Sequence, residues 1–242
     1  FRRMDYLNSF VSEQVSTGAW GTAVLGKIVP LTSDGEQLYY AGGQIEQAVF
    51  AGESLYLSGQ LSAGSAFRQS EPRYTYLEFL GNSFYRLTPR SWITSRIRQQ
   101  TAWNWTAFRQ LVLDNDAGLR GYEANELTGD NRIVANVEYR IFPDLSLLSF
   151  GFSGALFYDA GTVWRQSEKL HRAQVHHAAG LGIRIHNEEL FGPYLIIRVD
   201  VPYNFDRRKM GQIVLAIGQL FPAFKHPQFQ IPKIFGEDID VQ

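Results

Sequence analysis

The sequence predicts an all-β protein, an antiparallel transmembrane β-barrel of which about ten strands are visible. Three observations lead to this prediction. Apolar residues recur with a period of two, turn residues break the periodic segments at regular intervals, and the second face of the strands carries small and charged residues. Helical spacing does not persist for more than about one turn.

The period of two is clearest in the middle of the chain. Ile133, Val137 and Ile141 fall on one face of a predicted strand, whereas Glu138 and Arg140 fall on the other. The same alternation predicts the remaining strands. We expect strands at about 11–28, 37–50, 53–68, 72–87, 91–106, 131–142, 147–164, 174–187, 193–204 and 211–221.

The second face distinguishes a barrel from a soluble β-sandwich, which the periodicity alone would also allow. A sandwich buries its apolar face in a dry core, whereas a membrane barrel turns apolar residues to lipid and polar residues to its lumen. Here the second face combines glycine and serine with single ionised residues such as Arg184, Arg198 and Asp200. Aromatic residues near strand ends, including Trp92 and Tyr158, fit the interfacial girdles of a barrel.

Connection lengths predict the topology. A long link at 107–130 is followed by short turns at 143–146 and 188–192. Outer-membrane barrels have short periplasmic turns and longer external loops. We therefore expect residues 1–221 to form an integral barrel of the bacterial outer membrane, with loop 107–130 folded into the lumen from outside and the C-terminus in the periplasm.

Composition excludes several classes of function. The formal net charge is −1, so a nucleic-acid partner is not expected. The absence of cysteine excludes disulfides, thiol catalysis and cysteine-ligated metals. No Gly-x-Ser-x-Gly nucleophile elbow occurs, and the adjacent His176 and His177 point to opposite faces of a strand, so they cannot share a metal ion. We expect no enzyme activity, no cofactor and no metal.

Three short motifs follow one another in the second half of the chain. Their residues are Leu119, Arg120, Gly121 and Tyr122 in the long loop, Asn136, Glu138 and Arg140 in the next strand, and Phe157, Asp159 and Gly161 in the strand after it. Together they resemble the BamA/TamA-like (bacterial surface antigen) family of outer-membrane β-barrels. In that family the sixth loop carries a hydrophobic-Arg-Gly-aromatic tip, and the next two strands carry polar-x-Glu-x-Arg and Phe-x-Asp-x-Gly.

The resemblance covers about residues 107–221 and implies that the ten strands match the C-terminal strands of a sixteen-strand barrel. In lipid, an open sheet would leave backbone groups unpaired. About six strands and any POTRA domains would then be absent from this sequence. We therefore expect either a piece of a longer barrel or a wall that another chain completes in an oligomer. The sequence opens at Phe1 without a signal-peptide pattern, so either a signal was removed or the N-terminus lies upstream.

A loop folded into the lumen would bury the guanidinium of Arg120, and that desolvation is costly without a carboxylate partner. Glu138 and Asp159 are expected to point inward from adjacent strands, and either can accept a bidentate contact. The resemblance implies Asp159 as the leading partner. Gly121 allows a tight loop tip and Gly161 leaves room beside it. Our hypothesis is that this cluster locks the loop; the alternative is that its charges lie on separate solvated surfaces.

The end of the chain departs from the family pattern. The predicted closing strand contains Ile213, Leu215, Ile217, Gly218 and Phe221. A segment with three prolines interleaved with phenylalanine and isoleucine follows at 222–242. Prolines prevent pairing as a strand and favour an extended form. We expect this periplasmic tail to be either disordered or a docking peptide for a partner or for the base of the barrel.

The resemblance implies a barrel that assembles, inserts or translocates proteins, or lipids, at the outer membrane by opening a seam between its first and last strands. Its partners would be membrane lipids and other envelope proteins, as substrates or as subunits of a complex. The second hypothesis is a structural or scaffold barrel with a plugged lumen, which recruits periplasmic partners through its C-terminal tail.

Overall fold

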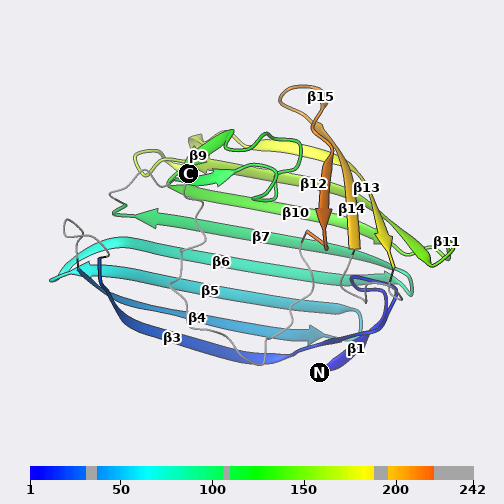
Figure 1. Cartoon of the computed structure of the whole chain (residues 1–242), viewed down its shortest axis with the longest axis horizontal. Helices are drawn as coiled ribbons and strands as arrows, with labels where there is room; N and C mark the ends of the chain where they lie inside the picture. Colours follow the sequence, from blue (N-terminus) through cyan, green and yellow to red (C-terminus); the bar gives the residue numbers. More distant parts are fainter. Residues whose placement is uncertain (31–36, 106–109, 188–195, 221–242) are drawn as a thin grey trace.

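One antiparallel sheet dominates the computed structural model, which describes residues 1–30, 37–105, 110–187 and 196–220 (Figure 1). The long strands follow chain order across the sheet. They are β3 (Gly18–Ile28), β4 (Leu38–Ala51), β5 (Leu55–Arg68), β6 (Glu71–Thr88), β7 (Ser91–Trp103), β10 (Asn131–Ile141), β12 (Phe150–Trp164), β13 (His176–His186) and β14 (Ile196–Asn204). Short strands join its margins: β11 (Ser146–Leu147) pairs with β12, and β15 (Lys209–Met210) and β16 (Val214–Ile217) pair with β14.

The prediction of an all-β antiparallel fold is confirmed, and each predicted strand contributes to this sheet. Two predicted boundaries are wrong by more than three residues. The strand expected at 11–28 breaks before Gly18, where φ is 125°, and the preceding β2 (Glu13–Val15) pairs with β1 (Arg2–Met4) in a separate hairpin. The last strand stops four residues early, because Gly218 has φ 85° and leaves the extended conformation.

The two faces of the sheet differ as expected for a wall between lipid and a polar interior. Large aliphatic side chains lie exposed on the outer face: Ile45, Leu61, Ile97, Val137, Leu156, Leu181, Ile183 and Leu215. Charged residues such as Glu138, Arg184 and Asp200 lie buried on the inner face. A soluble protein would bury the aliphatic set and expose the charged one. The distribution therefore agrees with a transmembrane β-sheet.

One aromatic residue does not lie where the sequence predicted. Trp92 is fully buried at the inner face and packs with Tyr56, Phe84 and Phe142, so it is not part of an interfacial girdle. Its position follows from register, because Trp92 pairs with the inward-facing Arg140. Tyr158, also assigned to a girdle, is exposed on the outer face.

The connections give the sheet two distinct ends. We call one the turn end, where short connections lie at 52–54, 89–90 and 142–149, and the other the loop end, with connections at 104–130, 165–175 and 205–213. The two-residue connection at 69–70 also lies at the loop end. The expected asymmetry therefore holds for the part of the chain after residue 104, whereas the connection at 69–70 is as short as those of the turn end.

The sheet curls strongly along its width: in Figure 1, β13, β14 and β16 run steeply across the direction of β4 to β10. Its margins are β3 on one side and β14 with β16 on the other. Within the described ranges no pairing joins β3 to β16, so the strands form an open curved wall. Separately, no helix in the described part of the chain is long and apolar enough to cross a membrane.

Candidate functional site

The long connection at the loop end folds back onto the inner face of the sheet. It forms a small hairpin of β8 (Leu111–Leu113) and β9 (Leu127–Gly129), which contacts β10 and β12. Leu113 and Leu119 are fully buried and pack in one cluster with Val134 of β10. Apolar burial therefore contributes to holding this loop against the sheet.

Asp114 organises the tip of the loop, a role the sequence did not reveal. One carboxylate oxygen accepts hydrogen bonds from the backbone N–H groups of Asp116 and Ala117, at 3.1 and 3.0 Å. The other accepts from the N–H of Asn125 at 3.0 Å, and the Asp114 carbonyl accepts from Leu119 at 2.8 Å. The signal that could have found it is an Asx-turn pattern, an aspartate before a short polar stretch.

Arg120 projects from this tip into a fully buried position with carboxylates on three strands. Nε and Nη2 donate to the two oxygens of Asp159 on β12 at 2.7 and 2.8 Å, a bidentate contact. Nη1 donates to Glu138 on β10 at 2.6 Å and to Asp200 on β14 at 3.2 Å. The backbone N–H of Arg120 also donates to Asp159 at 3.3 Å. The two candidate partners from the sequence thus meet the same guanidinium, and Asp200 joins them.

Further arginines surround these carboxylates. The buried ionic cluster consists of Arg120, Arg140, Arg184 and Arg198 with Glu138, Asp159 and Asp200, and none of these side chains is more than 8% exposed. Desolvating such charges is expensive, and alternating opposite charges offset that cost. We refer to these residues as the ionic cluster.

Phe157 and Gly161 shape the space around the loop. The guanidinium carbon of Arg120 lies 3.5 Å from the centre of the Phe157 ring, a cation–π contact that covers one face of the guanidinium. A side chain at Gly161 would approach Leu113 of the loop to 2.9 Å, so glycine leaves the room that this leucine occupies.

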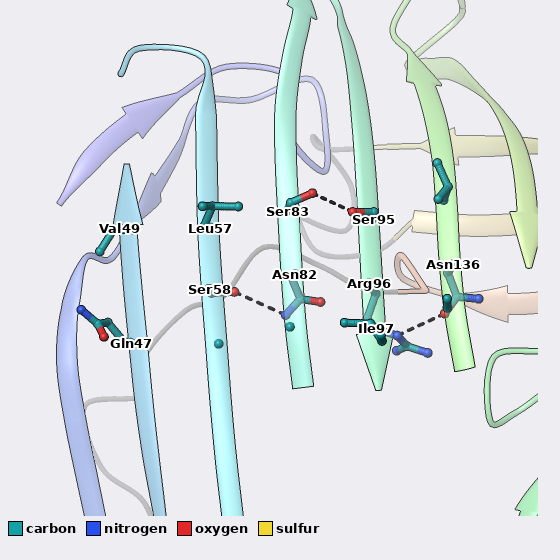
Figure 2. A pocket seen from close by; sticks show the side chains of 14 residues that line it. Gln47, Val49, Leu57, Ser58, Asn82, Ser83, Ser95, Arg96, Ile97 and Asn136 are labelled. Carbon is teal, nitrogen blue, oxygen red and sulfur yellow. Dashed lines mark hydrogen bonds between the residues drawn. The ribbon is translucent and has the colours of Figure 1, made fainter. Parts of the chain in front are cut away.

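Asn136 supports the cluster from β10. Its Nδ2 donates to the carbonyl of Gly118 at 2.6 Å and to Asp159 at 2.7 Å, and its Oδ1 accepts from Nε of Arg96 at 3.3 Å. Figure 2 shows the contact between Arg96 and Asn136. This amide therefore fixes both the loop backbone and the carboxylate that holds Arg120.

Tyr122 attaches the loop tip to the last strands at the loop end. Its hydroxyl donates to Asp206 at 2.9 Å and to the carbonyl of His177 at 3.2 Å. Burial, and to a smaller extent the hydrogen bond to Asp206, raises the pKa of the Tyr122 hydroxyl, so this group remains protonated and can donate. Nearby, the hydrogen bond from Arg207 lowers the pKa of the exposed Glu123.

Gly121 lies in the left-handed region, with φ 88°. A Cβ there would come within 3.0 Å of Pro202 Cβ. Gly121→Ala is therefore expected to weaken docking of the loop by about 1–3 kcal/mol, the usual cost of such strain. Cleavage of loop 107–130 by proteinase K in intact membranes measures this. Gly52→Ala is the control, because Gly52 also has a positive φ but no atom within 4 Å of an added Cβ; equal loop cleavage in both variants would contradict the prediction.

The predicted closing-strand residues do not join this site. Ile213, Leu215 and Ile217 are exposed on the outer face, Gly218 ends the strand, and Phe221 lies outside the described residues, as does the tail at 222–242.

A shallow groove of about 660 Å³ crosses the outer face over β4, β5, β6, β7 and β10 (Figure 2). Its lining includes small residues such as Gly59 and Gly81. The hydroxyls of Ser83 and Ser95, also in the lining, hydrogen-bond to each other at 2.6 Å. Exposed side chains such as Val49, Leu57 and Ile97 line it from the outer face. Arg96 and Asn136 are also among its lining residues, and Asn136 reaches the ionic cluster from the inner face. Among the described residues, no group of three His, Asp or Glu side chains is placed to hold a metal ion.

Comparison with known families gives one match. The model of the Omp85 superfamily domain matches residues 40–221, which is most of the chain and begins well before the motifs at 119–161. This confirms the resemblance drawn from those motifs. A search of curated proteins gave no match.

Proposed function

Because this chain belongs to the Omp85 superfamily, we propose that it is an outer-membrane barrel segment that assembles, inserts or translocates proteins, with loop 107–130 locked against its inner face. The superfamily works in the outer membrane, in protein insertion or translocation, together with other envelope proteins and without enzymatic activity. For this chain in particular, we propose both that the substrate is a protein and that the contacts of Arg120 lock the loop.

The contact of Arg120 with three carboxylates carries the proposal. A guanidinium seated on β10, β12 and β14 ties the loop to three neighbouring strands at once. A loop that only covered the surface would need no such buried charge, whose removal from water is costly. These contacts therefore support the proposal that the position of the loop on the inner face matters for function, as it would beside a pathway for a polypeptide.

The proposed topology follows from the two ends of the sheet. Long connections cluster at the loop end after residue 104, which supports an external loop end and a periplasmic turn end. On this arrangement the chain after β16, including 222–242, emerges into the periplasm. We also propose that the strands correspond to the C-terminal part of a larger barrel, since the wall is open at β3.

A scaffold barrel is the second candidate. One observation favours it: the inner face is filled at the loop end by residues 110–130 and at the turn end by the N-terminal hairpin. A filled lumen suits a barrel that recruits partners, and 222–242 would be the recruiting segment.

Reconstitution into liposomes distinguishes the two. The native full-length protein is incorporated, a urea-unfolded outer-membrane barrel is added, and its protease-protected insertion is followed over time. An assembly factor is expected to accelerate insertion over empty liposomes, and Arg120→Leu is expected to reduce that acceleration. No acceleration by the native protein would reject the assembly proposal and favour the scaffold; acceleration unaffected by Arg120→Leu would reject the role of the lock.

A further inference from the structure

The N-terminal hairpin is a second segment that fills the inner face, at the opposite end from the loop. Leu7 and Val15 are fully buried against an aromatic seat from β5, β6 and β7, in which Trp92 is also fully buried. Figure 1 shows this dark-blue segment at the turn end, beside the ends of β13 and β14. It is not part of the ladder of the main sheet, because β1 and β2 pair only with each other among the described strands.

The hairpin is fixed by polar contacts as well as by packing. Asn8 donates from its backbone N–H and its Nδ2 to the carboxylate of Glu13, at 3.1 and 3.0 Å, which closes the turn between β1 and β2. The hydroxyl of Tyr56 donates to the carbonyl of Ser16 at 3.0 Å. Phe10 packs edge-on against His186, with ring centres 5.0 Å apart. The hairpin thus bridges strands from both halves of the sheet.

A chain of hydrogen bonds leads from this hairpin to the ionic cluster on the side of the last strands. The carbonyl of Asn8 accepts from Nε2 of Gln219 at 2.8 Å, and Oε1 of Gln219 accepts from Nε of Arg184 at 3.3 Å. Arg184 donates in turn to Asp200, which accepts from Arg120 of the loop at 3.2 Å. Gln219 lies two residues after β16, so this path runs beside the last strand.

A second path returns to the same asparagine on the side of β10. Arg120 donates to Oε1 of Glu138 at 2.6 Å, and Oε2 of Glu138 accepts from Nε of Arg140 at 2.8 Å. Arg140 then donates from Nη1 to Oδ1 of Asn8 at 3.4 Å. The two paths form a closed ring in which Arg120 anchors the loop and Asn8 anchors the hairpin.

We propose that residues 1–17 are a second plug of the inner face, coupled to loop 107–130 through this ring of hydrogen bonds. Removing either anchor leaves buried charged or polar groups without partners, so the other anchor loses part of its support. A binding event that displaces the hairpin at the turn end therefore loosens the loop at the loop end, and the reverse holds by thermodynamic reciprocity. This inference concerns the two plugs and does not depend on what the barrel transports.

Residues 1–242 contain no cysteine, so each introduced cysteine is the sole thiol of this part of the protein, and any cysteine outside it is first replaced by serine. Two reporters are used in the full-length protein in membranes: Ser9→Cys in the hairpin, where Ser9 is 1% exposed, and Ala117→Cys in the loop, where Ala117 is 8% exposed. Maleimide labelling rates are compared with and without Gln219→Leu. Gln219 belongs to neither of the hydrophobic clusters that hold the hairpin and the loop. We expect both rates to rise by at least about fivefold, the lower end of typical coupling between sites.

Reciprocity and specificity are tested by three further variants. Arg120→Leu is expected to raise labelling at position 9, and Leu7→Asp to raise labelling at position 117. Gln60→Leu is the matched control, since Gln60 is an inner-face glutamine bonded to Ser62 and outside the ring. A rise at position 9 alone upon Gln219→Leu would show a tether without coupling and overturn the proposal, as would no rise at either position or an equal rise with Gln60→Leu.

Discussion

Arg120→Leu is expected to destabilise the docked loop by about 3–5 kcal/mol, the usual cost of removing one partner from a buried ion pair. Three carboxylates on three strands would lose the cation that they share. Arg140 and Arg184 would still contact Glu138 and Asp200. Within the described part of the chain, Asp159 would keep only its hydrogen bonds to backbone and to Asn136. We expect proteinase K to cut loop 107–130 in intact membranes and the unfolding midpoint in urea to fall.

The matched control removes an ion pair that is exposed. Arg90 lies 3.5 Å from Asp144, with side chains 43% and 93% exposed, and such surface pairs are worth about 0–1 kcal/mol. Because Arg90 also lies over the ring of Tyr6 in the hairpin, at 5.5 Å from its centre, the pair is removed from the other side by Asp144→Leu, which should leave the loop protected. If Arg120→Leu behaved like this control, the buried contacts of Arg120 would not be what holds the loop.

Reversing the charges of Arg120 and Asp159 has a different expected effect on loop protection in the structure than in the motifs alone. From the motifs, exchanging the charges of Arg120 and Asp159 should partly restore a lock that either single reversal breaks. In the structure, an aspartate at position 120 would face Glu138 and Asp200, which are both acidic. We therefore expect the combination of Arg120→Asp and Asp159→Arg to restore little protection, because only one of three contacts regains opposite charges.

The fold was largely predictable because side-chain alternation is a local property of each strand. Outer-face Leu181 and Ile183 and inner-face Arg184 fall where the period of two placed them. What the pattern could not give was where a strand ends, since Gly18 and Gly218 break strands through their backbone angles and not through a change of periodicity. The buried seat of Trp92 also depends on the N-terminal hairpin, a contact remote in sequence.

The site was predictable as far as its motifs reached. Arg120, Glu138 and Asp159 meet because the strands that carry the two carboxylates are adjacent, with Glu138 opposite Phe157 in the ladder. Asp200 was assigned to the polar face but not to the cluster, because its distance from Arg120 depends on the curl of the sheet, which alternation does not encode. Gln219 could not have been linked to Asn8 from sequence, as they are 211 positions apart.

The second large effect concerns the outer face. Leu181 lies in the middle of β13 and is 65% exposed. In a soluble sheet, an exposed leucine can be replaced by arginine at a cost within about 0.5 kcal/mol. At the midplane of a bilayer, the same replacement costs about 2–4 kcal/mol, because the guanidinium must leave water. We expect Leu181→Arg to lower the free energy of unfolding from liposomes by the larger amount.

Leu170→Arg separates the bilayer from a general effect of charge. Leu170 is 49% exposed, comparable to Leu181, but it lies in the short helical turn Leu170–Arg172 within a loop-end connection. Arginine near or beyond the interface costs only about 0–1 kcal/mol. A large loss at 181 with a small loss at 170 would place the middle of β13 in hydrocarbon. Equal losses would mean that the aliphatic outer face meets water or protein, and the apolar residues around the wall would then need a protein partner to cover them.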